Sequence, residues 1–213
     1  MKQAISAISA FVLGTAAFAA QAGGMEALEN FVKTAKTGRA EFTQVVTAPA
    51  REGQAARSKT SSGTFEFSRP NRFRFDYKKP FQQAIVADGR TLWLYDADLN
   101  QVTARTQAQV LGSTPAALIA AAPDLAALRQ DFNLEPAPDR DGLQWVQATP
   151  KSREGQLNQV RIGFRGNDLA RLEILDSFGQ TSVMTFNQLQ LNTPVPAGSF
   201  DFKPPKGADV VRQ

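Results

Sequence analysis

The 213-residue sequence contains no cysteine and no histidine. Without cysteine the fold has no disulfides, and the chain cannot carry a lipid on an N-terminal cysteine of its own. Without histidine it lacks the usual general base and the usual zinc ligand. Carboxylates remain available, but no spaced pair stands out, and no glycine-rich phosphate loop or GxSxG motif occurs. We therefore predict a binding protein rather than an enzyme, with no cofactor and no metal site.

Long apolar runs are also scarce, and the N-terminal one reads as a targeting segment. The chain begins MKQ and continues as an uncharged, alanine-rich stretch up to Ala20, which is too short to span a bilayer comfortably. Two A-x-A sequences allow cleavage after Ala19 or Ala22. We expect residues 1–22 to be a cleaved secretory signal peptide and residues 23–213 to form one exported domain. An uncleaved membrane anchor is the less favoured alternative.

The net charge is +4, and basic residues are interspersed with acidic ones. Basic residues among aromatics, as around Arg72 and Arg74, can indicate nucleic-acid binding. Export argues against that partner, so we predict no nucleic acid. On an extended strand Arg72 and Arg74 share one face, which is either simply solvated or a docking surface for an acidic partner or anionic headgroups.

The pattern of the chain predicts one helix followed by strands. Residues 25–36 repeat apolar side chains on one helical face, with glutamates early, lysines late and Gly38 placed to end the helix. Alternating segments with turn signals between them then predict an antiparallel sheet. We expect strands near 39–47, 63–69, 71–77, 81–87, 91–95, 99–105, 131–135, 143–148, 157–165, 168–176 and 180–191.

Between the two groups of strands lies the sequence STPAALIAAAPDLAALRQDF. Thr114 is a suitable N-cap with Pro115 at the first helical position, and Pro123 ends that helix and opens another. The first of these helices has no polar side chain from Ala116 to Ala122, so it cannot keep one side in water. It is either a buried core helix or an apolar lid over an internal cavity.

These elements predict an α+β, mainly β domain. Its strands form a strongly curved antiparallel sheet of about eleven strands, an unclosed β-barrel around helices on the concave side. Near the C-terminus, in FDFKPPKGADV, two prolines stop a short last strand. No repeat or linker divides the chain, and we expect a monomer.

The segment GTFEFSRPNRFRFDY carries the most informative residues. Alternate residues of a strand share a face, and this face holds four phenylalanines, a tyrosine and, between them, an arginine. They are Phe65, Phe67, Arg69, Phe73, Phe75 and Tyr77. A charge on an aromatic surface needs acceptors. We expect the aromatic residues to line an apolar cavity, and Arg69 to face it unless a bulge at Pro70 turns it outward.

The strings FSRPNRFRFDY, VADGRTLWLYD, STPAALIA and FDFKPPKGADV together resemble the outer-membrane lipoprotein carrier family, LolA, over nearly the whole exported chain. The resemblance implies an unclosed β-barrel with an α-helical lid. It also implies a periplasmic chaperone that binds the acyl chains of lipoproteins. Such a carrier accepts its cargo from an inner-membrane ABC transporter and delivers it to an outer-membrane receptor.

The resemblance further implies roles for single residues. The arginine of the family's RPN motif corresponds to Arg69, which would hold the lid closed by hydrogen bonds to lid backbone groups. The apolar face of the lid would be Leu28, Phe31, Val32, Leu118, Ile119 and Ala120. Relatives often carry tryptophan where this chain has Phe75, a change that affects the detailed shape of the cavity.

Two other functions remain open from the residues alone. The same fold can serve as a periplasmic sensor or scaffold that binds a peptide or regulatory protein through its cavity or a sheet edge. A hydrolase of exported glycans would need two carboxylates facing each other at a fixed separation.

Overall fold

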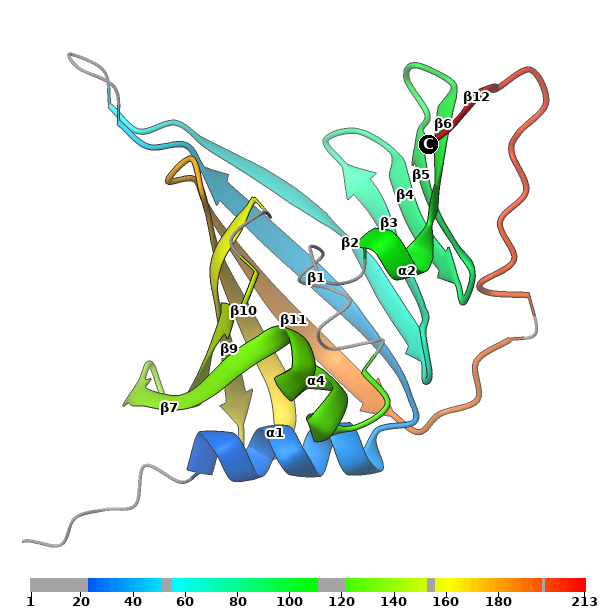
Figure 1. Cartoon of the computed structure of the whole chain (residues 1–213). Helices are drawn as coiled ribbons and strands as arrows, with labels where there is room; N and C mark the ends of the chain where they lie inside the picture. The colour runs from blue at the N-terminus through cyan, green and yellow to red at the C-terminus, as the bar shows by residue number, and fades with distance from the viewer. Residues whose placement is uncertain (1–22, 51–54, 111–121, 153–155, 197) are drawn as a thin grey trace, which may run out of the picture.

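The computed structural model describes residues 23–50, 55–110, 122–152, 156–196 and 198–213 (Figure 1). Within these residues no helix is long and apolar enough to cross a membrane. The predicted signal peptide, residues 1–22, lies outside the described residues and stays a prediction.

The elements are α1 (Gly23–Thr34), β1 (Thr37–Thr47), β2 (Ser58–Ser68), β3 (Arg72–Lys79), β4 (Gln83–Asp88), β5 (Thr91–Asp96), β6 (Gln101–Thr106), α2 (Gln107–Val110), α4 (Leu125–Asp131), β7 (Phe132–Arg140), β8 (Leu143–Pro150), β9 (Leu157–Arg165), β10 (Asp168–Asp176), β11 (Thr181–Leu191) and β12 (Asp209–Arg212).

All twelve strands belong to one sheet, in the order β12-β6-β5-β4-β3-β2-β1-β11-β10-β9-β8-β7. Neighbouring strands are antiparallel except β12 and β6, which are parallel. The fold is therefore mainly β with short helices, as predicted, but the sheet is mixed. Its two edges, β7 and β12, lie at opposite ends of the strand order, so the sheet does not close.

The predicted strong curvature is not observed, because the sheet is neither closed nor strongly curled (Figure 1). The helices and their apolar side chains lie on one face of the sheet, which we call the inner face, and α1 packs there against strands β7 to β10. The predicted last strand is also wrong. Phe200 lies in a turn, and the final strand forms after the two prolines, at Asp209–Arg212, where it pairs with β6.

Helix α1 forms where the sequence predicts a helix. Glu26 lies in its first turn and Lys33 in its last, where each side chain complements the helix dipole. Its apolar stripe is fully buried: Leu28, Phe31 and Val32 are each 1% exposed. Burial of such side chains stabilises the fold by about 2 kcal/mol each.

One large cluster of buried side chains joins α1 to both halves of the sheet. The ring of Phe31 lies 6.1 Å from Phe67 of β2 and 5.9 Å from Phe164 of β9, measured between centroids. Since β2 and β9 are on opposite sides of β1 in the strand order, α1 lies between the two halves of the sheet. This position places the helix over the inner face.

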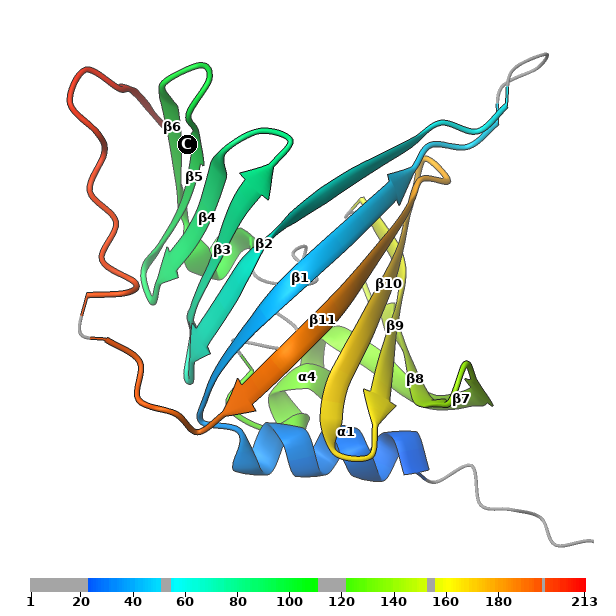
Figure 2. The same ribbon diagram turned by 180° about the vertical axis from the view of Figure 1, so that it is seen from behind.

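The C-terminal segment after β11 returns along β3 to β6 (Figure 2). It is fixed by Phe202, which contacts the rings of Trp93 and Tyr95 at centroid distances of 5.5 and 6.0 Å. In addition, the guanidinium of Arg72 lies 5.5 Å from the centre of the Phe200 ring. This contact gives Arg72 a structural partner, whereas the sequence left its face as solvated or as a docking surface.

The predicted helix over 116–122 lies outside the described residues except for Ala122. The helix predicted after Pro123 is confirmed as α4, and Asp124 is its N-cap, with its side chain accepting a hydrogen bond from the Ala127 N–H.

Candidate functional site

Arg69 lies in the turn between β2 and β3 and faces the inner side of the sheet. Its backbone N–H donates to the Lys36 carbonyl at 2.8 Å, which ties the turn to the chain just after α1. The centre of its guanidinium lies 5.6 Å from the Phe31 ring centroid and 5.4 Å from that of Phe67. The side chain is therefore not turned outward at Pro70.

The guanidinium of Arg69 is held by backbone carbonyls from two separate segments. Its Nε donates to the Ala35 carbonyl at 2.8 Å and its Nη1 to the Ala122 carbonyl at 2.5 Å. Ala35 directly follows α1, and the last carbonyls of a helix lack partners within the helix. Burial lowers the pKa of Arg69 to about 10, so the group stays charged at neutral pH. One charged side chain thus joins the end of α1 to the segment before α4.

The predicted aromatic residues form one continuous surface on the inner face. We call Phe65, Phe67, Phe73 and Phe75 the aromatic wall, and none of them is more than 2% exposed. Within it, Phe65 stacks on Phe75 at 4.4 Å and on Phe67 at 5.7 Å between ring centroids. Phe31, one of the predicted lid residues of α1, contacts the wall through Phe67, and the other two, Leu28 and Val32, belong to the same buried cluster. The other predicted lid residues, Leu118, Ile119 and Ala120, lie outside the described residues.

Tyr77 ends this aromatic surface with a polar group. Its ring lies 5.0 Å from the ring of Phe42, and its hydroxyl donates to Gln44 Oε1 at 3.0 Å. The Gln44 amide in turn donates to the Ser182 hydroxyl at 2.7 Å. Burial raises the pKa of Tyr77 to about 12, so its hydroxyl stays neutral. A hydrogen-bonded chain therefore crosses β3, β1 and β11 beyond the phenylalanines.

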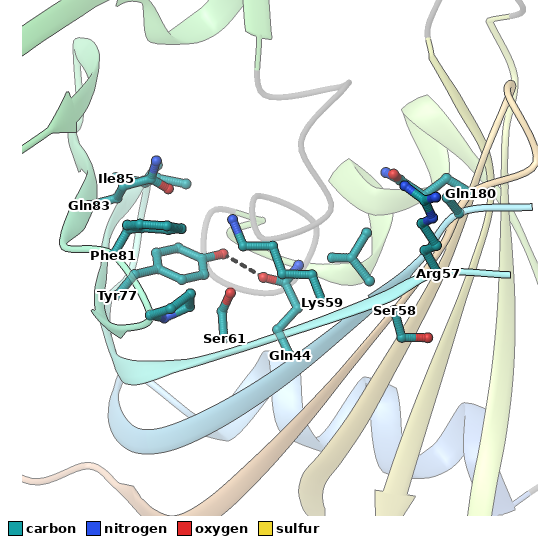
Figure 3. Close-up of a pocket in the computed structure, with 13 residues that line it drawn as sticks. Gln44, Arg57, Ser58, Lys59, Ser61, Tyr77, Phe81, Gln83, Ile85 and Gln180 are labelled. Atoms are coloured by element: carbon teal, nitrogen blue, oxygen red, sulfur yellow. Dashed lines mark hydrogen bonds between the residues drawn. The ribbon is translucent and has the colours of Figure 1, made fainter. Parts of the chain in front are cut away.

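A cavity of about 400 Å³ opens beyond this chain, at the end of the strands away from α1 (Figure 3). We call it the mouth cavity. Tyr77 is the single residue among the predicted site residues that lines it; the aromatic wall itself is filled by packed side chains. The described residues that line the mouth cavity are Gln44, Val46, Ala48, Arg57, Ser58, Lys59, Ser61, Tyr77, Pro80, Phe81, Gln83, Ile85 and Gln180.

Gln107 connects two segments that the sequence singled out and was itself missed. It is 2% exposed, accepts from the Gly89 N–H at 2.9 Å and donates to the Asn71 carbonyl at 2.6 Å. It thereby joins the turn of VADGRTLWLYD to the RPN turn that carries Arg69. A single polar residue at the start of a four-residue helix, α2, gives no pattern by which sequence reasoning could find it.

No group of three or more acidic side chains within the described parts of the chain is placed to hold a metal ion. The candidate site consists of the aromatic wall, the guanidinium of Arg69 beside the helices and the mouth cavity. Such an arrangement can bind an apolar ligand if the helical cover moves.

Comparison with known proteins agrees with this geometry. A protein from Albidiferax ferrireducens described as an outer-membrane lipoprotein carrier protein is 70% identical over 198 residues, covering 91% of this chain and 93% of its own. A Leptothrix cholodnii protein of the same description is 55% identical over 195 residues, covering 92% and 88%.

The solved structure of a LolA superfamily protein from Nitrosomonas europaea is similar to this fold. It has a TM-score of 0.50 at 13% identity and covers 84% of this chain and 98% of its own. The family model for the outer membrane lipoprotein carrier protein LolA matches residues 33–203. With relatives this similar across nine-tenths of its length, the chain belongs to the LolA family of outer-membrane lipoprotein carriers.

Proposed function

We propose that this protein is a periplasmic carrier that binds the acyl chains of outer-membrane lipoproteins. Its close similarity to outer-membrane lipoprotein carrier proteins supports lipoproteins as cargo. The same family membership agrees with the prediction that the chain is not an enzyme. In the proposed cycle residues 23–213 act as one monomeric domain after the signal peptide is removed. The domain accepts cargo from an inner-membrane ABC transporter and releases it to an outer-membrane receptor.

The observation that carries the proposal is the position of Arg69 between the aromatic wall and two helix-associated carbonyls. We infer that α1, together with the segment before α4, is a lid over an acyl-chain cavity. Arg69 is its latch, because its two hydrogen bonds hold both segments down at once. Opening breaks these bonds and separates the lid from the phenylalanines.

Burial of acyl methylenes can offset the exposure of the lid side chains. Exposing Leu28, Phe31 and Val32 costs about 2 kcal/mol each, whereas every acyl methylene removed from water contributes about 0.8 kcal/mol. Roughly eight buried methylenes offset the loss of the three side-chain contacts. One long acyl chain can therefore replace the lid residues on the wall, and the cargo shifts the balance between a closed and an open state.

The test is the Arg69→Leu variant in a transfer assay with acylated lipoprotein. We expect it to bind lipoprotein, because the aromatic wall is unchanged. We also expect it to deliver little to the receptor. Without the latch the closed, empty protein is less stable, so the release of cargo that restores this state becomes less favourable. Arg39→Leu, at an exposed position on β1, is the matched control and should transfer normally. Normal transfer by Arg69→Leu would overturn the latch.

A second measurement separates the carrier from a sensor or scaffold of the same fold. Mass spectrometry of protein purified from the native periplasm should show acylated cargo or free lipid. Depletion of the protein should make lipoproteins accumulate at the inner membrane. Lipoproteins that still reach the outer membrane after depletion would remove the main support for the carrier.

A further inference from the structure

The mouth cavity is lined by two cations and, among its described lining residues, by no carboxylate. The cations are Arg57 and Lys59 of the β1–β2 hairpin, and neither pairs with an acidic side chain within the described part of the chain. The Lys59 ammonium lies 4.6 Å from the centre of the Phe81 ring, so the β3–β4 turn holds it over the cavity. Within the described residues, these two positive charges therefore have no acidic partner.

The other polar residues of the cavity can share in binding an anion. Figure 3 shows Ser61 and Lys59 near the centre of the cavity, with Arg57 and Gln180 on the side opposite Phe81 and Tyr77. Hydroxyl and amide groups donate hydrogen bonds to carboxylate or phosphate oxygens. The volume of about 400 Å³ lies within the range of small-molecule sites.

On two strands the inward side chains change from aromatic to polar toward this cavity, whose lining also includes apolar side chains such as Val46 and Ile85. On β1 the inward residues run from Phe42 to Gln44, and on β11 from Phe186 to Ser182. Tyr77 touches Phe42 with its ring and Gln44 with its hydroxyl, so the apolar and polar parts meet there. A hydrocarbon chain, a neutral polar link and an anionic head would meet matching surfaces in that order.

We infer that the mouth cavity binds the anionic head of a lipid whose hydrocarbon chain lies along the aromatic wall. The head is a carboxylate or a phosphate, as in a free fatty acid or a phospholipid. This inference rests on the proposed function in one respect, since it uses the same wall for the chain. It adds a second class of ligand, because Arg57 and Lys59 recognise a charge at the head of the lipid itself.

The test compares three twelve-carbon ligands at pH 8, below the concentrations at which they form micelles. Laurate and dodecyl phosphate carry an anionic head, and 1-lauroylglycerol carries a neutral one. By calorimetry we expect the exported chain to bind the two anions about five to ten times more tightly than the neutral lipid, since each exposed ion pair adds a modest amount. High salt should reduce this preference.

Variants locate the preference in the molecule. Replacing both cations by glutamine (Arg57→Gln with Lys59→Gln) should bring the affinity ratio to about one, and Arg57→Lys with Lys59→Arg should retain most of it. Arg165→Gln with Lys206→Gln, two exposed positions outside the mouth cavity, is the matched control and should leave the ratio unchanged.

The outcomes are distinguishable. Tighter binding of dodecyl phosphate than of laurate would favour a phosphate head, and the reverse would favour a carboxylate head. Equal binding of all three ligands would overturn the anionic site while leaving the acyl wall intact. A preference that survives in the double glutamine variant would place the anion elsewhere and also overturn it. Failure to bind any of the three would contradict the proposed carrier function as well.

Discussion

Arg69 is bound by carbonyls rather than by carboxylates. A carboxylate partner would leave a second buried charge behind each time the pair separated, which is expensive in an apolar site. The carbonyls of Ala35 and Ala122 leave only neutral dipoles, and these can turn to water when the segments move. A latch made in this way can open repeatedly at a moderate cost in free energy.

Gln107 supports the turn of this latch, and its substitution tests that role. In Gln107→Leu the N–H of Gly89, an exposed residue, and the carbonyl of the half-buried Asn71 lose their partner. Water can reach the Gly89 N–H, so we expect the free energy of unfolding to fall by about 1–3 kcal/mol, mainly through the Asn71 carbonyl. Urea denaturation measures this change. Gln109→Leu, at an exposed position of the same helix, should alter stability by no more than about 0.5 kcal/mol.

The sequence predicted the inward direction of Arg69, because the period of two continues from Phe65 across the break at Pro70. It did not identify the acceptors, since Ala35 and Ala122 act through backbone carbonyls and their side chains carry no signal. Gln107 was missed for a related reason. Its partners are 18 and 36 residues away in sequence, and only the assembled sheet brings them together.

At the scale of elements, the β4–β5 turn is built around the carboxylate of Asp88. One oxygen accepts from the N–H groups of Arg90 and Thr91 at 2.8 Å each, and the other from the Trp93 indole at 2.9 Å. Burial alone would raise the pKa of Asp88. The hydrogen bonds from Thr91, Trp93 and Arg90, with the charge of Arg90, outweigh burial and lower the pKa below 3.8.

This lowered pKa makes the turn a source of acid sensitivity. The stability that the ionised carboxylate contributes is complete above pH 3.8 and is lost as the pH falls through the lower folded-state pKa. We therefore expect the Asp88→Asn variant to be less stable than wild type at pH 7, by about 1 kcal/mol. Its free energy of unfolding should also fall less between pH 5 and pH 2.

Chemical denaturation across that pH range is the measurement. Asp98→Asn, at an exposed position in the β5–β6 turn, removes the same charge and is the control; it should be about as stable as wild type at pH 7. A steeper acid dependence in Asp88→Asn than in wild type would contradict the assignment.

The start of strand β2 was predicted poorly, because its first residues do not follow the alternating apolar pattern. Strand β2 begins at Ser58 rather than near residue 63, and Ser58 pairs with Thr47 at the end of β1. Its first five residues, Ser58 to Ser62, are polar and exposed or half-buried, so they lack the alternation of polar and apolar residues that identifies a half-buried strand. The strand signal is therefore weakest where the mouth cavity lies.

At the scale of the whole molecule, the sheet has two halves that meet at β1 and are joined again by α1. The parallel pairing of β12 with β6 was not predictable, because it joins Asp209 to Gln101 across about half of the chain and follows two prolines. The expectation of a strongly curved, unclosed barrel failed in its curvature for the same reason. Local alternation identifies the strands but does not specify which edges remain apart.

This arrangement predicts how the molecule opens. If α1 is the lid, we expect it to move while the central strands stay paired, because β1 and β2 pair along eleven residues each. Hydrogen exchange can follow both parts separately. Adding a synthetic triacylated lipopeptide should speed hydrogen exchange in peptides covering residues 23–36 and 122–131. In the first of these, the Ala35 N–H, which donates to the Phe31 carbonyl, should lose protection. Peptides from β1 and β2 should exchange as slowly as before.

The Arg69→Leu variant distinguishes opening from a general loss of stability. Without the latch, exchange in the same two segments should be raised before any ligand is added, and the lipopeptide should raise it little further. Exchange that rises equally in β5 and β6, which lie far from the strands packed against α1, would indicate global destabilisation instead. A lipopeptide that slows exchange in α1 would mean that the helix closes over the acyl chains, and the lid would then have to be sought in another part of the molecule.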